Sequence, residues 1–199
     1  MMDIKQKPCG IYMTNCYIVN VDGKEFIIDP GVDATQWVKD NVKNPVAILN
    51  THGHFDHVWS NAELKEYCNI PIYAPKDDVF MLSSDPFSQG TPQSSADVEV
   101  VGDEEFEIEG VKVKYFLFPG HTPGCSAILI GDVFFSGDFI FKSSIGRVDF
   151  PYSNPEDMKK SIEKFLQFKE NYRVYPGHGE STDVFSEQKT LPAWLNYLA

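Results

Sequence analysis

The five histidines of this chain lie in three short segments that are otherwise rich in glycine, proline and acidic residues. One segment holds His52, His54, Asp56 and His57, and the other two hold His121 and His178. Side chains two positions apart on an extended segment project to the same side, so the imidazoles of His52 and His54 can face one ion. Asp56 and His57 begin the next turn and can point elsewhere into the same cavity. Imidazole and carboxylate groups together suit zinc, iron or manganese.

The first segment offers more ligands than one metal ion needs. Four donor side chains within six residues, together with the distant histidines, exceed what one tetrahedral ion accepts. We therefore predict two metal ions. A lone histidine on a loop is most often an ordinary polar residue, but His121 and His178 each follow an apolar strand and stand beside glycine, which permits a tight turn next to a metal.

Predicted strands lead directly into these segments. Short apolar or alternating runs predict strands over 16–21, 24–28, 46–49, 70–73, 105–109, 111–118, 126–130, 133–135 and 173–175. The strand over 46–49 runs into the first histidine segment, and the strand over 173–175 runs into His178. Two-residue turns at Asp22-Gly23 and Gly131-Asp132 join neighbouring strands into hairpins.

Helices are predicted between the strands. Asp33 suits the N-cap of a helix that ends before Pro45, residues 58–67 and 75–82 have helical patterns, and Asn154 caps a helix that starts at Pro155. Strands with a helix pair, followed by the same again, predict two sheets packed face to face with helices outside. The polar stretch 83–96 is expected by default to be a mobile surface loop, although its length also suits a lid or a substrate-binding segment. The aromatic tail 194–198 is expected to cover the core, with contact to a partner subunit as the alternative.

Composition limits the class of protein. The chain has 199 residues, 42% of them hydrophobic, and can fill one sizeable core, so we predict a single domain over residues 1–199. The formal charge of −12 argues against nucleic-acid binding, which needs clustered lysine and arginine. Neither a signal peptide nor a membrane-spanning run is recognisable, which predicts a cytoplasmic protein without membrane contact. The four cysteines lack a paired spacing and are interpreted as free thiols.

The combined motifs resemble those of the metallo-β-lactamase-fold hydrolase superfamily. The resemblance rests on the H-x-H-x-D-H pattern of residues 52–57, on His121 at a strand end, on Asp138 in Ser136-Gly137-Asp138 and on His178 between two glycines. It covers about residues 15–178. The resemblance implies an α/β fold, namely a four-layer αββα sandwich of two mixed β-sheets flanked by helices.

The resemblance also implies a division of the ligands. His52, His54 and His121 would hold one divalent ion, Asp56, His57 and His178 would hold the other, and Asp138 would bridge both. Asp29, in Asp29-Pro30-Gly31, would orient ligands from outside the coordination sphere. Zinc is the expected metal, with iron and manganese as alternatives.

Within the superfamily, residues 137–151 and the turn 119–124 resemble those of hydroxyacylglutathione hydrolases (glyoxalase II) and their short bacterial relatives. Only 21 residues follow His178, whereas the longer glyoxalase II enzymes carry a C-terminal helical domain that supplies glutathione contacts. Arg147 falls where the family has a basic residue near the substrate's carboxylate. It is the expected substrate-binding residue, with a surface salt bridge as the alternative.

The expected reaction is hydrolysis of a small thioester or ester, such as an S-hydroxyacylglutathione. A water that bridges two cations loses its proton near neutral pH, since one zinc ion already lowers its pKa to ~7. The hydroxide would attack a carbonyl that one metal polarises. Asp56 is the expected catalytic residue, both ligating a metal and orienting the hydroxide or receiving its proton. The expected partner is a small-molecule substrate, and the protein is expected to be a monomer or homodimer.

Other members of this fold family provide competing hypotheses. A persulfide dioxygenase would bind a single iron at His52, His54 and His121, which are all present. An acyl-homoserine lactonase is expected to have a tyrosine three residues after the bridging aspartate, where this chain has Phe141. A flavodiiron oxygen reductase has glutamate in place of His54 and needs a flavin domain, and nucleic-acid-processing members insert whole domains. A purely structural zinc site would need closed coordination.

Overall fold

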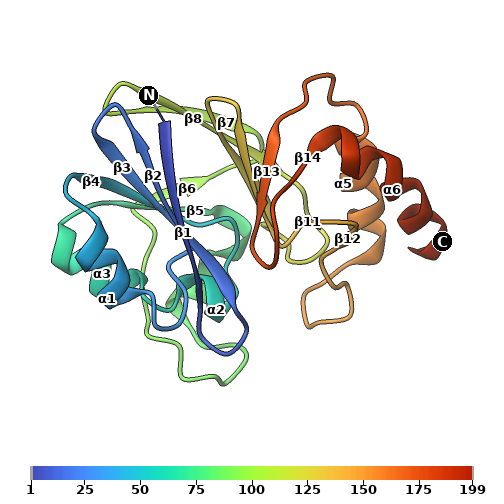
Figure 1. The fold of residues 1–199 in the computed structure, drawn as a ribbon. Coiled ribbons are helices and arrows are strands. Elements are labelled where there is room, and N and C mark those ends of the chain that lie inside the picture. The colour runs from blue at the N-terminus through green and yellow to red at the C-terminus, as the bar shows by residue number, and fades with distance from the viewer. Residues whose placement is uncertain (1, 199) are drawn as a thin grey trace.

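The computed structural model describes residues 2–198 and consists of two six-stranded sheets with helices outside them (Figure 1). The first sheet has the order β1 (Met2–Cys9), β2 (Thr14–Val21), β3 (Lys24–Ile28), β4 (Pro45–Leu49), β5 (Ile72–Pro75), β6 (Val98–Val100). The second has the order β14 (Thr182–Asp183), β13 (Arg173–Pro176), β10 (Val133–Gly137), β9 (Ser126–Ile130), β8 (Val111–Leu117), β7 (Glu104–Ile108). A short ribbon pairs β11 (Ile140–Phe141) with β12 (Ser144–Ile145).

The helices fall into two sets, one for each sheet. The first half of the chain contains α1 (Thr35–Asn41), α2 (Phe55–Val58), α3 (Asn61–Cys68), the 3₁₀ turn η1 (Lys76–Asp78) and α4 (Val79–Ser83). The second half contains α5 (Pro155–Phe165) and α6 (Val184–Leu198). Because α1 and α3 lie on the far side of the first sheet from α5 and α6, the layers follow the predicted αββα order (Figure 1).

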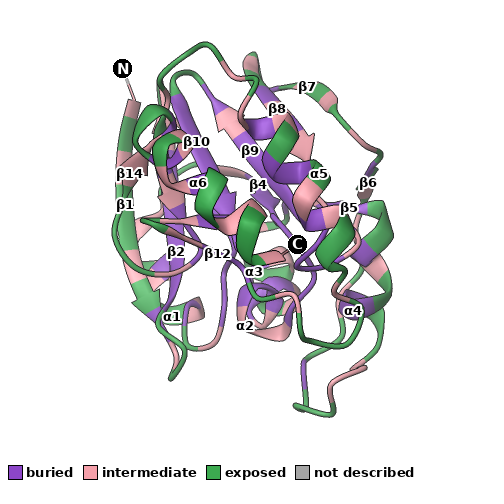
Figure 2. Ribbon diagram, turned by 90° about the vertical axis from the view of Figure 1, so that its right-hand side faces the viewer, coloured by how far each residue is buried: buried purple, intermediate pink, exposed green. Residues whose placement is uncertain are grey.

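Three apolar clusters hold these layers together. Neighbouring residues in the central strands face opposite sides: Phe26 and Ile28 pack between the sheets, whereas Ile27 packs toward the outer helices. In the second sheet Phe135 likewise faces the inner cluster and Phe134 the outer one. Because a strand buried on both faces needs apolar side chains on both, its sequence is a continuous apolar run, as the sequences of these strands are. Burial is accordingly concentrated in the sheets, while the helices expose their outer faces (Figure 2).

Strand direction gathers the predicted ligands at one edge of the sandwich. Strands β3, β4, β5 and β6 are parallel. In the second sheet β8, β10 and β13 share one direction, because β9 is antiparallel to β8 and β10 and because β13 is parallel to β10. The chain therefore leaves all these strands into loops at their carboxyl ends, the edge at which open α/β sheets bind ligands.

Several local predictions were wrong. The edge strand β1 was not predicted, because its solvent-facing alternate residues interrupt the apolar pattern. Asp33 is not an N-cap: it has a positive φ of 62° and α1 starts at Thr35 after Ala34. The helix expected over 58–67 is interrupted, since Ser60 donates its backbone N–H to Pro30 O at 2.9 Å and its hydroxyl to Gly31 O at 2.7 Å. These tertiary bonds end α2 and begin α3.

Other expectations are confirmed. Asn154 caps α5 by accepting from the backbone N–H groups of Glu156 and Asp157. The tail belongs to α6, and its Trp194 and Leu195 pack against the outer cluster of the second sheet. All four cysteines are free thiols. Within residues 2–198, no helix has both the length and the apolar character needed to cross a membrane.

Candidate metal centre

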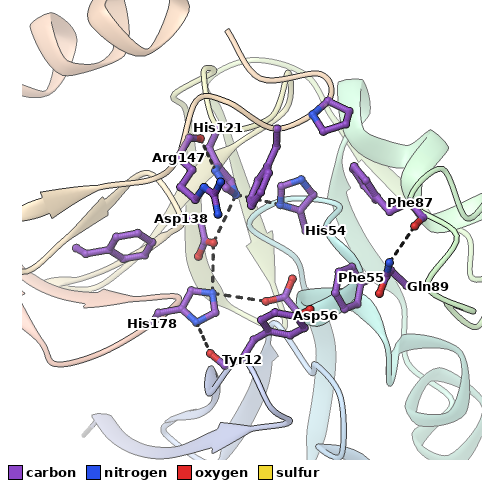
Figure 3. Close-up of a pocket in the computed structure, with 13 residues that line it drawn as sticks. Tyr12, His54, Phe55, Asp56, Phe87, Gln89, His121, Asp138, Arg147 and His178 are labelled. Carbon is purple, nitrogen blue, oxygen red and sulfur yellow. Dashed lines mark hydrogen bonds and ion pairs between the residues drawn. The ribbon is translucent and has the colours of Figure 1, made fainter. Parts of the chain in front are cut away.

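Five strand ends supply the polar side chains of one site. In the first sheet, Asp29 follows β3, and His52 and His54 follow β4, with Asp56 and His57 in the short helix α2 just beyond. In the second sheet, His121, Asp138 and His178 follow β8, β10 and β13, in that order. Residues from the two halves of the chain thus meet in one cavity (Figure 3).

The first ligand group consists of His52, His54 and His121. One nitrogen of each ring lies within 4.8 Å of the others, and all three residues are buried. His121 Nε2 is 2.9 Å from His54 Nδ1. Three converging imidazoles of this kind are a suitable set for one transition-metal ion.

The second ligand group consists of Asp56, His57 and His178, whose ligand atoms also lie within 4.8 Å of one another. Asp56 Oδ2 is 3.6 Å from His57 Nε2 and 3.5 Å from His178 Nε2. The Thr14 hydroxyl donates to the same carboxylate oxygen at 2.7 Å and fixes its position.

Asp138 stands between the two groups. Its Oδ2 is 3.4 Å from Nε2 of His121 and 3.3 Å from Nε2 of His178 (Figure 3). Its Oδ1 is 3.3 Å from His57 Nε2. One carboxylate therefore faces both ligand groups, the position in which a bridging ligand must lie.

Hydrogen bonds on the far side of the rings fix their orientation. Nδ1 of His121 donates to Arg147 O at 2.8 Å, and Nδ1 of His178 donates to Tyr12 O at 3.0 Å. A carbonyl can only accept, so Nδ1 carries the proton and Nε2 keeps its lone pair for a metal. His57 Nδ1 is 2.9 Å from Asp29 Oδ2, and Asp29 also accepts from the backbone N–H and the hydroxyl of Thr51. Asp29 therefore connects the ring of His57 to Thr51 through its carboxylate.

Unpartnered buried polar atoms test whether the residues of the site fit metal ions. Within the described part of the chain, four buried side-chain atoms have no hydrogen-bond partner: His52 Nε2, His57 Nε2, Asp138 Oδ1 and Ser94 Oγ. Buried polar groups are otherwise almost always satisfied. Three of these four atoms belong to the ligand groups and to the carboxylate between them, so the donor set fits divalent metal ions.

Burial and neighbouring charges shift the pKa values of these side chains in the metal-free protein. Burial holds the pKa of His52 well below its usual value and lowers that of His54 to about 3. Burial alone would also lower the pKa of His178, but Asp138 and Asp56 outweigh it and raise that pKa to about 9. Despite its burial, Asp56 has a pKa lowered to about 2, because His57 and His178 lie beside it. The carboxylate is thus ionised at neutral pH.

Gly177 has a packing reason to lack a side chain. A Cβ at this position would collide with Asp138 Oδ1 and would lie 2.7 Å from Cε1 of His57. The glycine before His178 therefore lets the backbone pass beside the carboxylate, as expected from the sequence.

Five of the seven candidate ligands, His54, Asp56, His121, Asp138 and His178, line a cavity of about 650 Å³ with largely aromatic walls. The aromatic residues are Tyr12, Phe55, Phe87, Phe141 and Phe150. Arg147 also lines the cavity: its guanidinium lies 4.2 Å from the centre of the Phe150 ring and forms two 2.8 Å hydrogen bonds with Asp149. The predicted substrate residue thus reaches the cavity while it is engaged in the predicted salt bridge.

Sequence reasoning missed most of the cavity wall. Phe87 and Gln89 come from the polar stretch 83–96, where a substrate-binding loop was expected, but no pattern marked these two residues. Tyr12 and Phe55 form an edge-to-face pair with ring centres 5.6 Å apart, contributed by the β1–β2 turn and by α2. Isolated aromatic residues on loops have no sequence signal that separates them from core residues.

Comparison with known proteins agrees with this geometry. Residues 9–178 match the sequence profile of the Metallo-beta-lactamase superfamily. "Probable metallo-hydrolase YqgX" of Bacillus subtilis is 32% identical over 96% of this chain and 97% of its own length. "Hydroxyacylglutathione hydrolase GloC" of Haemophilus influenzae is also 32% identical, with the same coverage of 96% and 97%.

Solved structures show the same architecture. The crystal structure of BLEG-1 B3 metallo-beta-lactamase superposes with a TM-score of 0.87 at 31% identity, covering 97% of this chain and 99% of that one. The structure of TTHA1623 in a di-iron-bound form superposes with a TM-score of 0.81 at 29% identity, covering 94% and 98%.

Proposed function

This chain belongs to the metallo-β-lactamase superfamily, and we propose that it is a dinuclear metal-dependent hydrolase of a small thioester or ester, of glyoxalase II type. The observation that carries the proposal is the position of Asp138, whose two oxygens face both ligand groups at 3.3–3.4 Å. A single-ion site would need only one of these groups.

Each ligand group would hold one metal ion. The first group would hold one ion, the second group the other, and Asp138 would bridge them. Bound divalent ions supply a water of lowered pKa and polarise the carbonyl to be attacked. Zinc is our proposal for the native metal, because imidazole and carboxylate suit it. The di-iron form of a structure that is 29% identical supports iron as the alternative.

Asp56 is the proposed catalytic residue. The Thr14 hydroxyl and His178 lie at its Oδ2, and the residue lines the cavity. Because its pKa is lowered to about 2, the carboxylate is ionised at neutral pH and can orient the attacking water by accepting a hydrogen bond from it. No serine or cysteine nucleophile is then needed.

The cavity supports a small substrate with an apolar part and an anionic end. A volume of about 650 Å³ suits a small molecule. The aromatic wall would contact the apolar portion, and Arg147 would pair with a carboxylate. The relative named hydroxyacylglutathione hydrolase supports an S-hydroxyacyl thioester of glutathione as the substrate. We further propose that the protein acts in the cytoplasm as a monomer or homodimer.

Two other activities remain as alternatives at the same site. The first ligand group alone is the set that a mononuclear-iron persulfide dioxygenase needs. For a lactonase, the edge-to-face contact of Phe141 with His178, at 5.9 Å between ring centres, places an apolar ring where a hydroxyl is expected. This contact favours a thioester hydrolase over a lactonase.

One experiment separates these functions. Purified protein is analysed for metal content and then assayed with S-lactoylglutathione, an acyl-homoserine lactone, a β-lactam and glutathione persulfide, with oxygen uptake recorded. We expect two ions per chain and thioester hydrolysis without oxygen uptake. Oxygen uptake with the persulfide, together with no turnover of any acyl substrate, would replace the hydrolase with the dioxygenase.

A further inference from the structure

Asp78 is a fully buried carboxylate that lies outside both ligand groups. It ends the 3₁₀ turn η1, directly after β5, and none of its surface is exposed. Its Oδ2 accepts the backbone N–H of Gly53 at 2.9 Å and the hydroxyl of Thr122 at 2.6 Å. Its Oδ1 accepts the backbone N–H of Gly124 at 2.7 Å.

These three hydrogen bonds connect two loops that are far apart in the sequence. Gly53 lies between His52 and His54, and Thr122 directly follows His121. The loops that Asp78 joins therefore carry all three members of the first ligand group. Its hydrogen bonds reach no member of the second group, whose His57 is held by Asp29 instead.

The glycines in these loops show how closely the carboxylate approaches. A Cβ at Gly53 would lie 2.7 Å from the backbone oxygen of Asp78, and a Cβ at Gly124 would lie 2.8 Å from the Asp78 carboxyl carbon. Real Cβ atoms do not tolerate such distances. Glycine at 53 and 124 thus allows both loops to reach the same carboxylate.

Asp78 is held in place by hydrogen bonds rather than by a countercharge. Among residues 2–198 no lysine, arginine or histidine forms an ion pair with it, and its burial raises its pKa to about 6. Burying an unpaired charge is unfavourable for folding. A carboxylate in such a place is explained if the spacing of the two loops serves the site they carry.

We propose that Asp78 is a positioning residue that fixes His52 and His54 against His121 and thereby sets the geometry of the first metal site. The inference rests on the two-metal assignment made under the proposed function. Asp78 touches neither substrate nor metal and acts through the backbone of both loops.

The test measures metal binding at each group separately. In a background with H178A, which disables the second group, zinc affinity is measured by competition with a chromophoric chelator before and after D78N. The asparagine side chain has an NH₂ group in place of one carboxylate oxygen. That group is a donor and cannot accept the hydrogen bonds that Gly53, Thr122 or Gly124 donate at this position. We expect binding about 10- to 100-fold weaker, the range seen when outer partners of metal ligands are removed. In an H121A background, which disables the first group, D78N should leave zinc affinity unchanged.

Matched variants keep this test decisive. E25Q is the control for losing a buried carboxylate, because Glu25 accepts the backbone N–H groups of Lys43 and Asn44 at 2.6 and 2.7 Å. E25Q should leave zinc affinity unchanged in both backgrounds. If D78N does not fold, T122V removes one of the three hydrogen bonds and should weaken the same site by a smaller factor.

The outcomes separate the two levels of inference. If neither single-group background binds one zinc ion, the two-metal assignment fails, whatever Asp78 does. If both backgrounds bind zinc and D78N weakens them equally, or weakens neither, Asp78 has only a structural role and the positioning proposal is overturned.

Discussion

Replacing Arg147 with alanine should impair the hydrolysis of substrates that carry a carboxylate and spare neutral ones. The guanidinium forms two 2.8 Å hydrogen bonds with Asp149 and lies over the Phe150 ring, with 63% of the side chain exposed. The backbone carbonyl of residue 147 accepts from His121 and is retained in R147A. The substitution therefore removes the charge without removing the support of a metal ligand.

The size of the effect follows from two competing pairs. An exposed ion pair such as Arg147–Asp149 contributes about 0–1 kcal/mol, whereas a charge-assisted hydrogen bond to a substrate carboxylate contributes about 1.5–3 kcal/mol. Exchanging the Arg147–Asp149 pair for a hydrogen bond to the substrate leaves a net stabilisation of the bound substrate of roughly 1–2 kcal/mol. R147A should therefore lower kcat/KM about 5- to 30-fold for the carboxylate substrate. D149N removes the competitor and should raise the same value by up to about 5-fold.

The assay compares two thioesters that differ only in a carboxylate and its methyl ester, with wild type, R147A and D149N. We expect R147A to raise KM for the acid with little change in kcat, because the arginine binds the substrate away from the reacting bond. Added salt should reduce the difference between the two substrates. Equal losses on the acid and the ester would show that residue 147 supports the cavity wall rather than an anionic group, and would refute the assignment.

Two further predictions concern the metal centre. D138A should abolish hydrolysis and lower the occupancy of both ions, as measured by elemental analysis, and a variant that kept full activity would exclude the bridging role. In the metal-free protein, the contribution of His178 to stability should be lost as the pH rises. The pKa of His178 is about 9 when folded, against a usual 6.5, so its contribution is complete below 6.5 and is lost as the pH rises through 9. The loss is at most about 3 kcal/mol. Chemical denaturation in chelator should show this slope for wild type and a flatter one for H178Q; equal slopes would contradict it.

Most of the polar side chains that converge at the site were predictable from the sequence, because four of them are close together in the chain. His52, His54, Asp56 and His57 lie within six residues, and glycines mark His121 and His178. The strands that precede these residues were also predictable. Central strands of two packed sheets are buried on both faces and must therefore be apolar throughout, which gives a continuous apolar run in the sequence. Edge strand β1 has only one packed face, so only alternate residues are apolar and the apolar run that marks a strand is interrupted.

Asp78 was not predictable in this way. It is one of 29 acidic residues, and its partners Gly53 and Thr122 are 25 and 44 positions away. Nothing in the residues around it signals a role, because that role comes from where β5 ends relative to two loops. The same holds for Asp33, whose side chain suits a helix cap although tertiary structure places its backbone in the left-handed region.

The distribution of ligands between the two sheets indicates what metal binding does to the fold. The first ligand group takes His52 and His54 from one half of the chain and His121 from the other, and the second takes Asp56 and His57 from one half and His178 from the other. Each bound ion would therefore join both sheets at the edge where the parallel strands end. Asp78 makes the same connection without a metal, from β5 to Thr122. The inner apolar cluster holds the sheets face to face, but it does not set the distance between loops at their edge. That distance depends on a few directional hydrogen bonds. A site whose chemistry requires fixed ligand spacing can therefore retain a buried carboxylate without a countercharge, although its burial is unfavourable for folding.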